Sequence, residues 1–133
     1  MTAFRFLFVG VGGGLLFAVL DGLLNGNPLA GRVLAYLKPI ARERIRIAAG
    51  VALDLLWGFA MAAIYLLVRS SLPGHALVKG ICYGALAWFF RVAMGAAGES
   101  VILRVPGSAT VYRLVTGAAE MLALGVFYGL VLI

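Results

Sequence analysis

Four ionisable side chains lie inside long apolar stretches of the sequence. They are Asp21, Asp54, Arg91 and Glu120, one in each stretch. A charge at the centre of a membrane helix costs at least about 2.5 kcal/mol on insertion scales, so such residues usually pair with one another or serve a function. Two kinds of chemistry fit these residue types. One is a buried ion pair that fixes how helices pack, and the other is a carboxyl group that takes up and releases protons.

Arg91 is the only basic residue deep within these stretches, and Glu120 and Asp54 are its expected partners. An arginine side chain can bridge two carboxylates through its planar fork of N–H donors. Three acids nevertheless face one base. Arg46 and Arg113 could reach inward from the ends of the stretches, and otherwise one carboxyl group holds a proton at neutral pH, because burial disfavours the ionised form. The charge layer therefore has two open interpretations, a structural one and one in proton-coupled transport.

Small residues accompany each of these charges on its helical face. Residues three, four and seven apart share a face of a helix, and small residues there let two membrane helices approach closely. We therefore expect each charge to face the interior of a helix bundle. The spacings Gly10/Gly14 and Gly80/Gly84 predict close helix contacts. The glycines that share a face with a charge are Gly10, Gly13, Gly14, Gly50, Gly58, Gly80, Gly84, Gly95, Gly98 and Gly117.

Aromatic residues have two predicted roles. Trp57 and Trp88 lie near the charge layer, where they pack in the core or donate an indole N–H to Asp54 or Glu120. Three tyrosines near the ends of the apolar stretches are expected in the aromatic belts at the membrane surface, where amphipathic rings accumulate. These tyrosines are Tyr36, Tyr65 and Tyr112.

The composition explains why these charges must be placed in a membrane. Of 133 residues, 64% are hydrophobic and 12% are charged, and the mean hydropathy is +1.09. About a quarter of the residues of an average soluble domain are charged. A soluble globular domain and a disordered chain are thereby excluded, and a disulfide scaffold is excluded because Cys82 is the only cysteine.

Four apolar stretches are long enough to cross a bilayer, which takes about 20 residues of helix. They cover residues 4–24, 47–68, 77–97 and 111–133. The sequence therefore predicts an all-α polytopic membrane protein, a single domain over residues 1–133 with an antiparallel bundle of four transmembrane helices. With a rise of about 1.5 Å per residue, the four charges lie roughly 5–13 Å deep, all measured from the same side. They fall in one leaflet whichever way the chain is oriented.

The first link, residues 25–46, is long and mixes apolar with basic side chains. This mixture favours an amphipathic segment in the headgroup region, with one short helix between Pro28 and Pro39. The alternative is an irregular solvated loop. In the first interpretation its basic side chains contact anionic lipid headgroups. These side chains are Arg32, Lys38, Arg42, Arg44 and Arg46.

Basic residues also predict the orientation of the chain, because lysine and arginine accumulate on the cytoplasmic side. Links one and three carry seven such residues and the opposite side carries three. We therefore expect links one and three in the cytoplasm and both termini outside it, in a bacterial inner membrane. The first group is Arg32, Lys38, Arg42, Arg44, Arg46, Arg104 and Arg113, and the second is Arg5, Arg69 and Lys79.

The stretch Lys79-Gly80-Ile81-Cys82-Tyr83-Gly84-Ala85-Leu86-Ala87-Trp88 resembles the third span of a family of small four-span bacterial membrane proteins of unknown function. This resemblance covers about one span, and it implies a fold without an activity.

Sequence motifs give no catalytic, nucleotide-binding or metal-binding pattern. We therefore expect a non-enzymatic protein without a cofactor or a nucleic-acid partner. The first hypothesis is an accessory or structural subunit that forms a homo-oligomer or joins a larger membrane complex. The alternative is a small proton-coupled carrier or channel that uses the intramembrane carboxylates. A lipid-modifying enzyme ranks third, with Asp21, His75 and Glu99 as further acid–base candidates.

Overall fold

The computed structural model describes residues 2–132, and these residues form helices joined by short connections. Four helical segments are long and apolar enough to cross a membrane. The prediction of an all-helical protein with four such segments is confirmed. The segments are α1 (Ala3–Asn25), α3 (Ile47–Val68) continuing into η2 (Arg69–Ser71), α4 (Ala76–Ala87) continuing through η3 (Trp88–Ala93) into α5 (Met94–Ile102), and α6 (Gly107–Val131).

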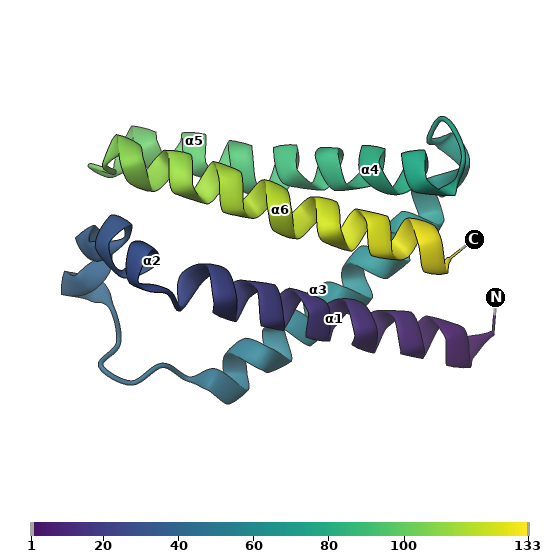
Figure 1. Cartoon of the computed structure of the whole chain (residues 1–133), viewed down its shortest axis with the longest axis horizontal. Coiled ribbons are helices and arrows are strands. Elements are labelled where there is room, and N and C mark those ends of the chain that lie inside the picture. Colours follow the sequence, from purple (N-terminus) through teal and green to yellow (C-terminus); the bar gives the residue numbers. More distant parts are fainter. Residues whose placement is uncertain (1, 133) are drawn as a thin grey trace.

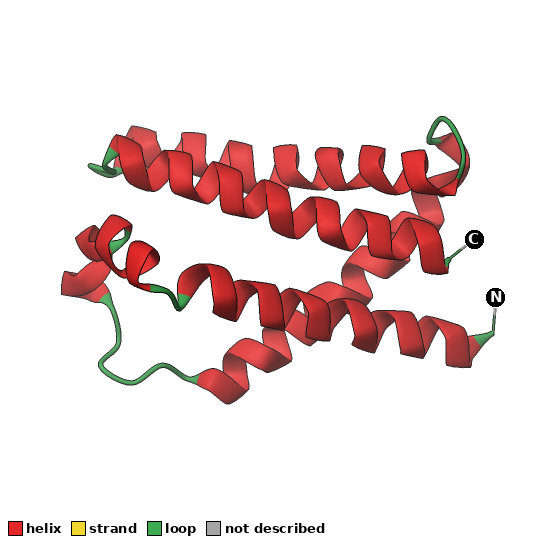
Figure 2. Cartoon of the chain, in the orientation of Figure 1, coloured by secondary structure: helices red, strands yellow, loops and turns green. Residues whose placement is uncertain are grey.

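The long helices associate as two pairs. α1 packs along α3, α4 packs along α6, and contacts between α1 and α6 join the pairs. Figure 1 shows successive long helices running in opposite directions, so that both ends of the chain lie at the same end of the molecule. Figure 2 shows that the longest stretch without helix is the connection that leads into α3.

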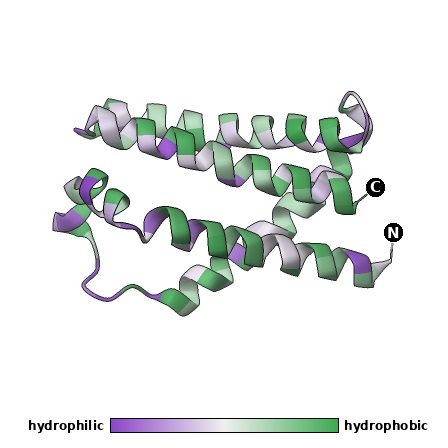
Figure 3. Ribbon diagram, viewed as in Figure 1, coloured by the Kyte–Doolittle hydropathy of each residue, from purple (hydrophilic) through white to green (hydrophobic). Residues whose placement is uncertain are grey.

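The surface of this helix assembly is apolar. Large hydrophobic side chains point outward from every long segment, for example Phe4 at 78% exposed, Leu67 at 80% and Phe90 at 71%. Figure 3 shows that hydrophobic residues predominate along the long helices. In water such a surface would be strongly unfavourable, whereas lipid chains solvate it at no cost. The distribution of side chains therefore agrees with four helices that cross a membrane.

Glycines hold α4 and α6 at backbone contact. A Cβ atom on Gly84 would lie 2.7 Å from the carbonyl oxygen of Met121, and one on Gly125 would lie 2.8 Å from the amide nitrogen of Gly84. A Cβ on Gly129 would likewise lie 2.9 Å from the Cα of Gly80. The predicted contact at Gly80/Gly84 is confirmed, because only glycine lets the two backbones approach this closely.

The α1–α3 pair is built in the same way. A Cβ atom on Gly14 would lie 2.7 Å from the Cα of Leu55, and one on Gly58 would collide with the backbone of Gly10 and Gly14. The predicted contact at Gly10/Gly14 is therefore confirmed. Both helix pairs depend on glycine at their crossing points.

Tyrosine hydroxyl groups connect α3 to the other helix pair. Tyr83 donates to the carbonyl of Met61 at 2.7 Å, and Tyr128 donates to the carbonyl of Gly58 at 2.7 Å. The rings of both lie 5.2–6.4 Å from each other or from the ring of Tyr65. Tyr65 is only 2% exposed. Its predicted place in an aromatic belt is therefore wrong, because this ring fills the core.

Basic side chains gather at the end of the molecule where both chain ends lie. Arg5 donates to the carbonyl of Val131, Arg69 donates to the carbonyl of Leu132 at 2.7 Å, and Lys79 donates to the carbonyl of Arg69 at 2.9 Å. The last carbonyls of a helix have no partner within the helix and carry partial negative charge. Arg5 and Arg69 therefore cap the C-terminal end of α6.

The first link forms two short helices where one is predicted. Asn27 caps the N-terminus of α2 (Pro28–Val33), because its side chain accepts a hydrogen bond from the amide of Ala30. The same side chain donates a hydrogen bond to the hydroxyl of Tyr112 at 3.0 Å. η1 (Ala35–Ile40) follows and contains Pro39. The Asn27 contact holds α2 against α6. The five basic residues predicted to meet lipid headgroups, Arg32, Lys38, Arg42, Arg44 and Arg46, are exposed.

Candidate functional site

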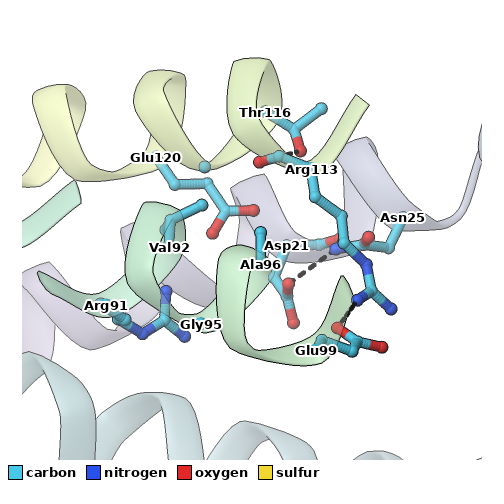
Figure 4. A pocket seen from close by; sticks show the side chains of 11 residues that line it. Asp21, Asn25, Arg91, Val92, Gly95, Ala96, Glu99, Arg113, Thr116 and Glu120 are labelled. Carbon is cyan, nitrogen blue, oxygen red and sulfur yellow. Dashed lines mark hydrogen bonds and ion pairs between the residues drawn. The ribbon is translucent and has the colours of Figure 1, made fainter. Parts of the chain in front are cut away.

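A polar cavity of about 410 Å³ opens between α1, η3, α5 and α6. Figure 4 shows this cavity, with the carboxylates of Asp21 and Glu120 pointing into the same space from α1 and α6. The structure therefore brings together three of the four predicted charges, Asp21, Arg91 and Glu120. The full lining is Asp21, Asn25, Arg91, Val92, Gly95, Ala96, Glu99, Arg113, Thr116, Gly117 and Glu120.

Glu120 is the most deeply placed acid of the cavity. Its side chain is 5% exposed, and within residues 2–132 its carboxylate has neither a hydrogen bond nor an ion pair. Asp21, in contrast, accepts a hydrogen bond from the side-chain amide of Asn25 at 2.8 Å. An ionised carboxylate is costly to bury without a partner. Glu120 therefore needs either a proton or a cation in the cavity.

Arg91 does not fill that need by direct contact. The centre of its guanidinium lies 4.8 Å from the ring centroid of Phe17 and 4.6 Å from that of Trp57. Such cation–π contacts stabilise a desolvated cation by about 2 kcal/mol or more. The expected ion pairs of Arg91 with Glu120 and Asp54 are not formed in the described part of the chain. Arg91 is held by aromatic faces of α1 and α3 instead.

The winding of η3 changes which residues share a face with Arg91. Residues Trp88–Ala93 form a π-helical segment, which hydrogen-bonds to the fifth residue along and is wider than an α-helix. The π-helical segment therefore shifts the helix faces after Ala93 relative to those before Trp88, and α5 (Met94–Ile102) is α-helical again. Gly80 contacts α6, but a Cβ on Gly95 or Gly98 would meet nothing within 4 Å. The expectation that Gly95 and Gly98 form helix contacts is wrong within this chain.

Arg113 pairs with Glu99 at the outer part of the cavity. The side chains are 28% and 26% exposed. The alternative in which Arg113 reaches Glu120 is therefore not observed. Tyr36 of η1 lies alongside, with its ring 5.7 Å from the Arg113 guanidinium, and burial raises the pKa of Tyr36 although Arg113 opposes this change. The first link thus approaches the cavity at the Arg113–Glu99 pair.

The Arg113–Glu99 pair is expected to contribute little to stability. Partly exposed ion pairs typically contribute about 0.2–1 kcal/mol, and salt screens them. A double-mutant cycle with Arg113→Gln and Glu99→Gln should give a coupling energy in this range that falls as salt is added. Unfolding in mixed detergent micelles measures it. A coupling well above this range and independent of salt would show that the pair is buried in the membrane.

Two predicted members of the site lie elsewhere. Asp54 is 9% exposed and does not line the cavity. Trp88 donates its indole N–H to the carbonyl of Leu114 at 2.9 Å, so its suggested bond to Asp54 or Glu120 is not formed. Trp57 supports the site through a cation–π contact of its ring with Arg91 and not through a hydrogen bond from its indole N–H.

From the sequence, Glu99 is named only as an acid–base candidate of a lipid-modifying enzyme, outside the charge layer, and Asn25 is not named. Glu99 lies beyond the predicted third stretch, residues 77–97, whereas the helix extends to Ile102, before the helix breaker Pro106. Asn25 lies four residues after Asp21, a spacing that places both on one face. Among the described residues, no cluster of three or more His, Cys, Asp or Glu could hold a metal ion.

Comparisons with known proteins add no relative to this description. No family model, no curated protein and no solved structure matches the chain.

Proposed function

We propose that this protein is a small, non-enzymatic membrane carrier that binds and releases a proton at Glu120. The observation that carries this proposal is a glutamate that is only 5% exposed, has no hydrogen bond or ion pair within the described residues and lines a polar cavity. A polar cavity gives water and solutes access to such a group. Intramembrane carboxylates of this kind form proton relays in pumps and transporters.

Arg91 separates this proposal from a purely structural charge layer. A structural layer would hold its charges as direct pairs, because unpaired buried charge is destabilising. In this protein Arg91 lies over two aromatic rings, and the ion pair Arg113–Glu99 is at the rim of the cavity. The central acid is thus left available for exchange.

The proposed orientation puts the cavity on the cytoplasmic side of a bacterial inner membrane. The cavity lies at the same end as the basic first link, whereas the three basic residues Arg5, Arg69 and Lys79 gather at the other end. The positive-inside rule then assigns the first link to the cytoplasm and both termini to the outside. In this orientation α2 and η1 lie at the lipid headgroups.

Assembly with further copies, or within a larger membrane complex, is a second candidate role. Gly50 and Gly98 have open space at the position of a side chain, so no helix within residues 2–132 packs against them. Both lie in membrane-spanning segments, where small residues favour helix association. Native mass spectrometry of gently extracted protein would give the mass of any such assembly, and a purely monomeric mass would oppose this role.

Infrared difference spectroscopy tests the exchangeable proton directly. In lipid, the wild-type protein should show the C=O stretch of a protonated carboxylic acid that disappears as the pH is raised, and Glu120→Gln should lack it. Glu99→Gln is the matched control, because the same change removes a carboxylate that already pairs with Arg113. If the band persists in Glu120→Gln, or if no carboxyl group titrates, the proposal fails.

A further inference from the structure

We propose that the cavity binds a small aliphatic primary ammonium ion, which exchanges with the proton of Glu120. This inference rests on the proposed carrier function and specifies its substrate class. Three properties of the cavity lead to it: its net charge, the hydrogen-bonding character of its lining and its size.

The charge of the cavity favours a cation. Its lining has three acids, Asp21, Glu99 and Glu120, and two bases, Arg91 and Arg113. Arg113 is paired with Glu99, which leaves two carboxylates and one guanidinium. With its acids ionised, the site has an excess of negative charge that a bound cation neutralises.

The lining distinguishes between kinds of cation. Besides the guanidinium groups of Arg91 and Arg113, the polar groups that line the space are carboxylates, the Asn25 amide and the Thr116 hydroxyl, and the other members are small residues. These groups offer hydrogen-bond acceptors to N–H donors. Quaternary ammonium ions have no N–H group and are recognised by cages of aromatic rings. No described aromatic residue lines this cavity, so a primary ammonium ion fits it and a quaternary one does not.

The size and placement of the acids favour a short chain with two amino groups. A volume of about 410 Å³ lies at the small end of ordinary ligand sites. Asp21 and Glu120 face this space from different helices (Figure 4). A diamine can offer one ammonium group to each carboxylate, whereas a monoamine satisfies only one. We therefore expect a short diamine to bind more tightly than a monoamine of the same length.

The basic residues of the protein do not make this cavity a binding site for anions. The exposed side chains of the first link, including Arg42 and Arg44, do not line the cavity. Arg91 is engaged by Phe17 and Trp57. An anion in the cavity would face Asp21 and Glu120 at close range, and like charges in a low-dielectric site repel strongly. Binding of a small dicarboxylate in place of a diamine would contradict this reasoning.

Proton linkage supplies the exchange. The ammonium ion binds to ionised Glu120, and protonation of Glu120 removes that partner. Binding and protonation therefore compete, so diamine affinity should fall as the pH is lowered, by up to about tenfold per pH unit for one exchanged proton. A diamine gradient across a membrane would then drive protons in the opposite direction.

Calorimetric titration of the purified full-length protein in lipid nanodiscs tests this site, with diaminobutane as the probe. We expect binding that weakens on acidification, and a loss of at least about tenfold in Glu120→Gln, since a hydrogen bond to a charged group is removed. Glu43→Gln is the control, because Glu43 is exposed on the first link, outside the cavity lining; its affinity should equal that of the wild type. Tetramethylammonium and succinate should give no heat of binding.

Several outcomes would overturn the inference: equal binding of diaminobutane to Glu120→Gln and wild type, equal binding of tetramethylammonium, or binding of succinate alone. Failure here remains distinct from failure of the proposed function. A titrating Glu120 band without diamine binding would leave the proton site standing and reject the amine. Loss of that band would reject the proton site itself.

Discussion

Substitution of Gly80 by leucine should cause the largest loss of stability of any single change considered for this protein. A side chain at this position would enter the backbone of α6, where the Cα of Val126 lies 3.2 Å from the position of the added Cβ and the carbonyl oxygen of Gly125 lies closer still. Backbone cannot rotate away as a side chain can. Overpacking of this kind typically costs about 1–3 kcal/mol, and occasionally more. We expect a lower free energy of unfolding and a lower yield of folded protein.

Gly98→Leu is the matched control for this experiment. A Cβ on Gly98 meets nothing within 4 Å, so leucine there should leave the monomer as stable as the wild type. Unfolding in mixed micelles measures both variants. Equal stability of Gly80→Leu and the wild type would show that α4 and α6 do not touch at this point. A destabilised Gly98→Leu would instead place a further helix against α5.

Removal of the tyrosine hydroxyl groups that connect the two helix pairs should have the second largest effect. Tyr128→Phe leaves the carbonyl of Gly58 without its 2.7 Å hydrogen bond, and Tyr83→Phe does the same to the carbonyl of Met61. Both carbonyls lie inside α3 and keep their bonds within the helix, so only the bond between helices is lost. Such bonds contribute about 0.6 kcal/mol on average and at most about 1.7 kcal/mol. We expect each variant to lose about 0.5–1.7 kcal/mol of unfolding free energy.

Tyr36→Phe controls for removal of the same oxygen atom elsewhere. The Tyr36 hydroxyl is buried and, within residues 2–132, has no hydrogen-bond partner. Its removal should be neutral or stabilising, because no bond is lost and a polar atom leaves a buried place. If Tyr36→Phe were as damaging as Tyr128→Phe, the losses would come from general repacking and not from the interhelical bonds.

Sequence alone determined the features that depend on local composition. Hydropathy and length located the four membrane-spanning segments, since each helix must present about 20 apolar residues to lipid wherever it packs. Spacing of small residues located the contacts at Gly10/Gly14 and Gly80/Gly84, because a close helix crossing leaves room for nothing larger. The rarity of charge in an apolar stretch singled out Asp21, Arg91 and Glu120, which the structure gathers in one cavity.

Only the tertiary structure decided what each of these side chains contacts. Nothing in the sequence marks Trp88–Ala93 as π-helical, and this winding shifts the faces of the residues after it relative to those before it. The choice of Phe17 and Trp57 over a carboxylate as partners of Arg91 depends on where α1 and α3 cross relative to η3. A helical face is a local property, but a partner across the bundle depends on the relative positions of several helices, and those positions follow from packing of the whole chain.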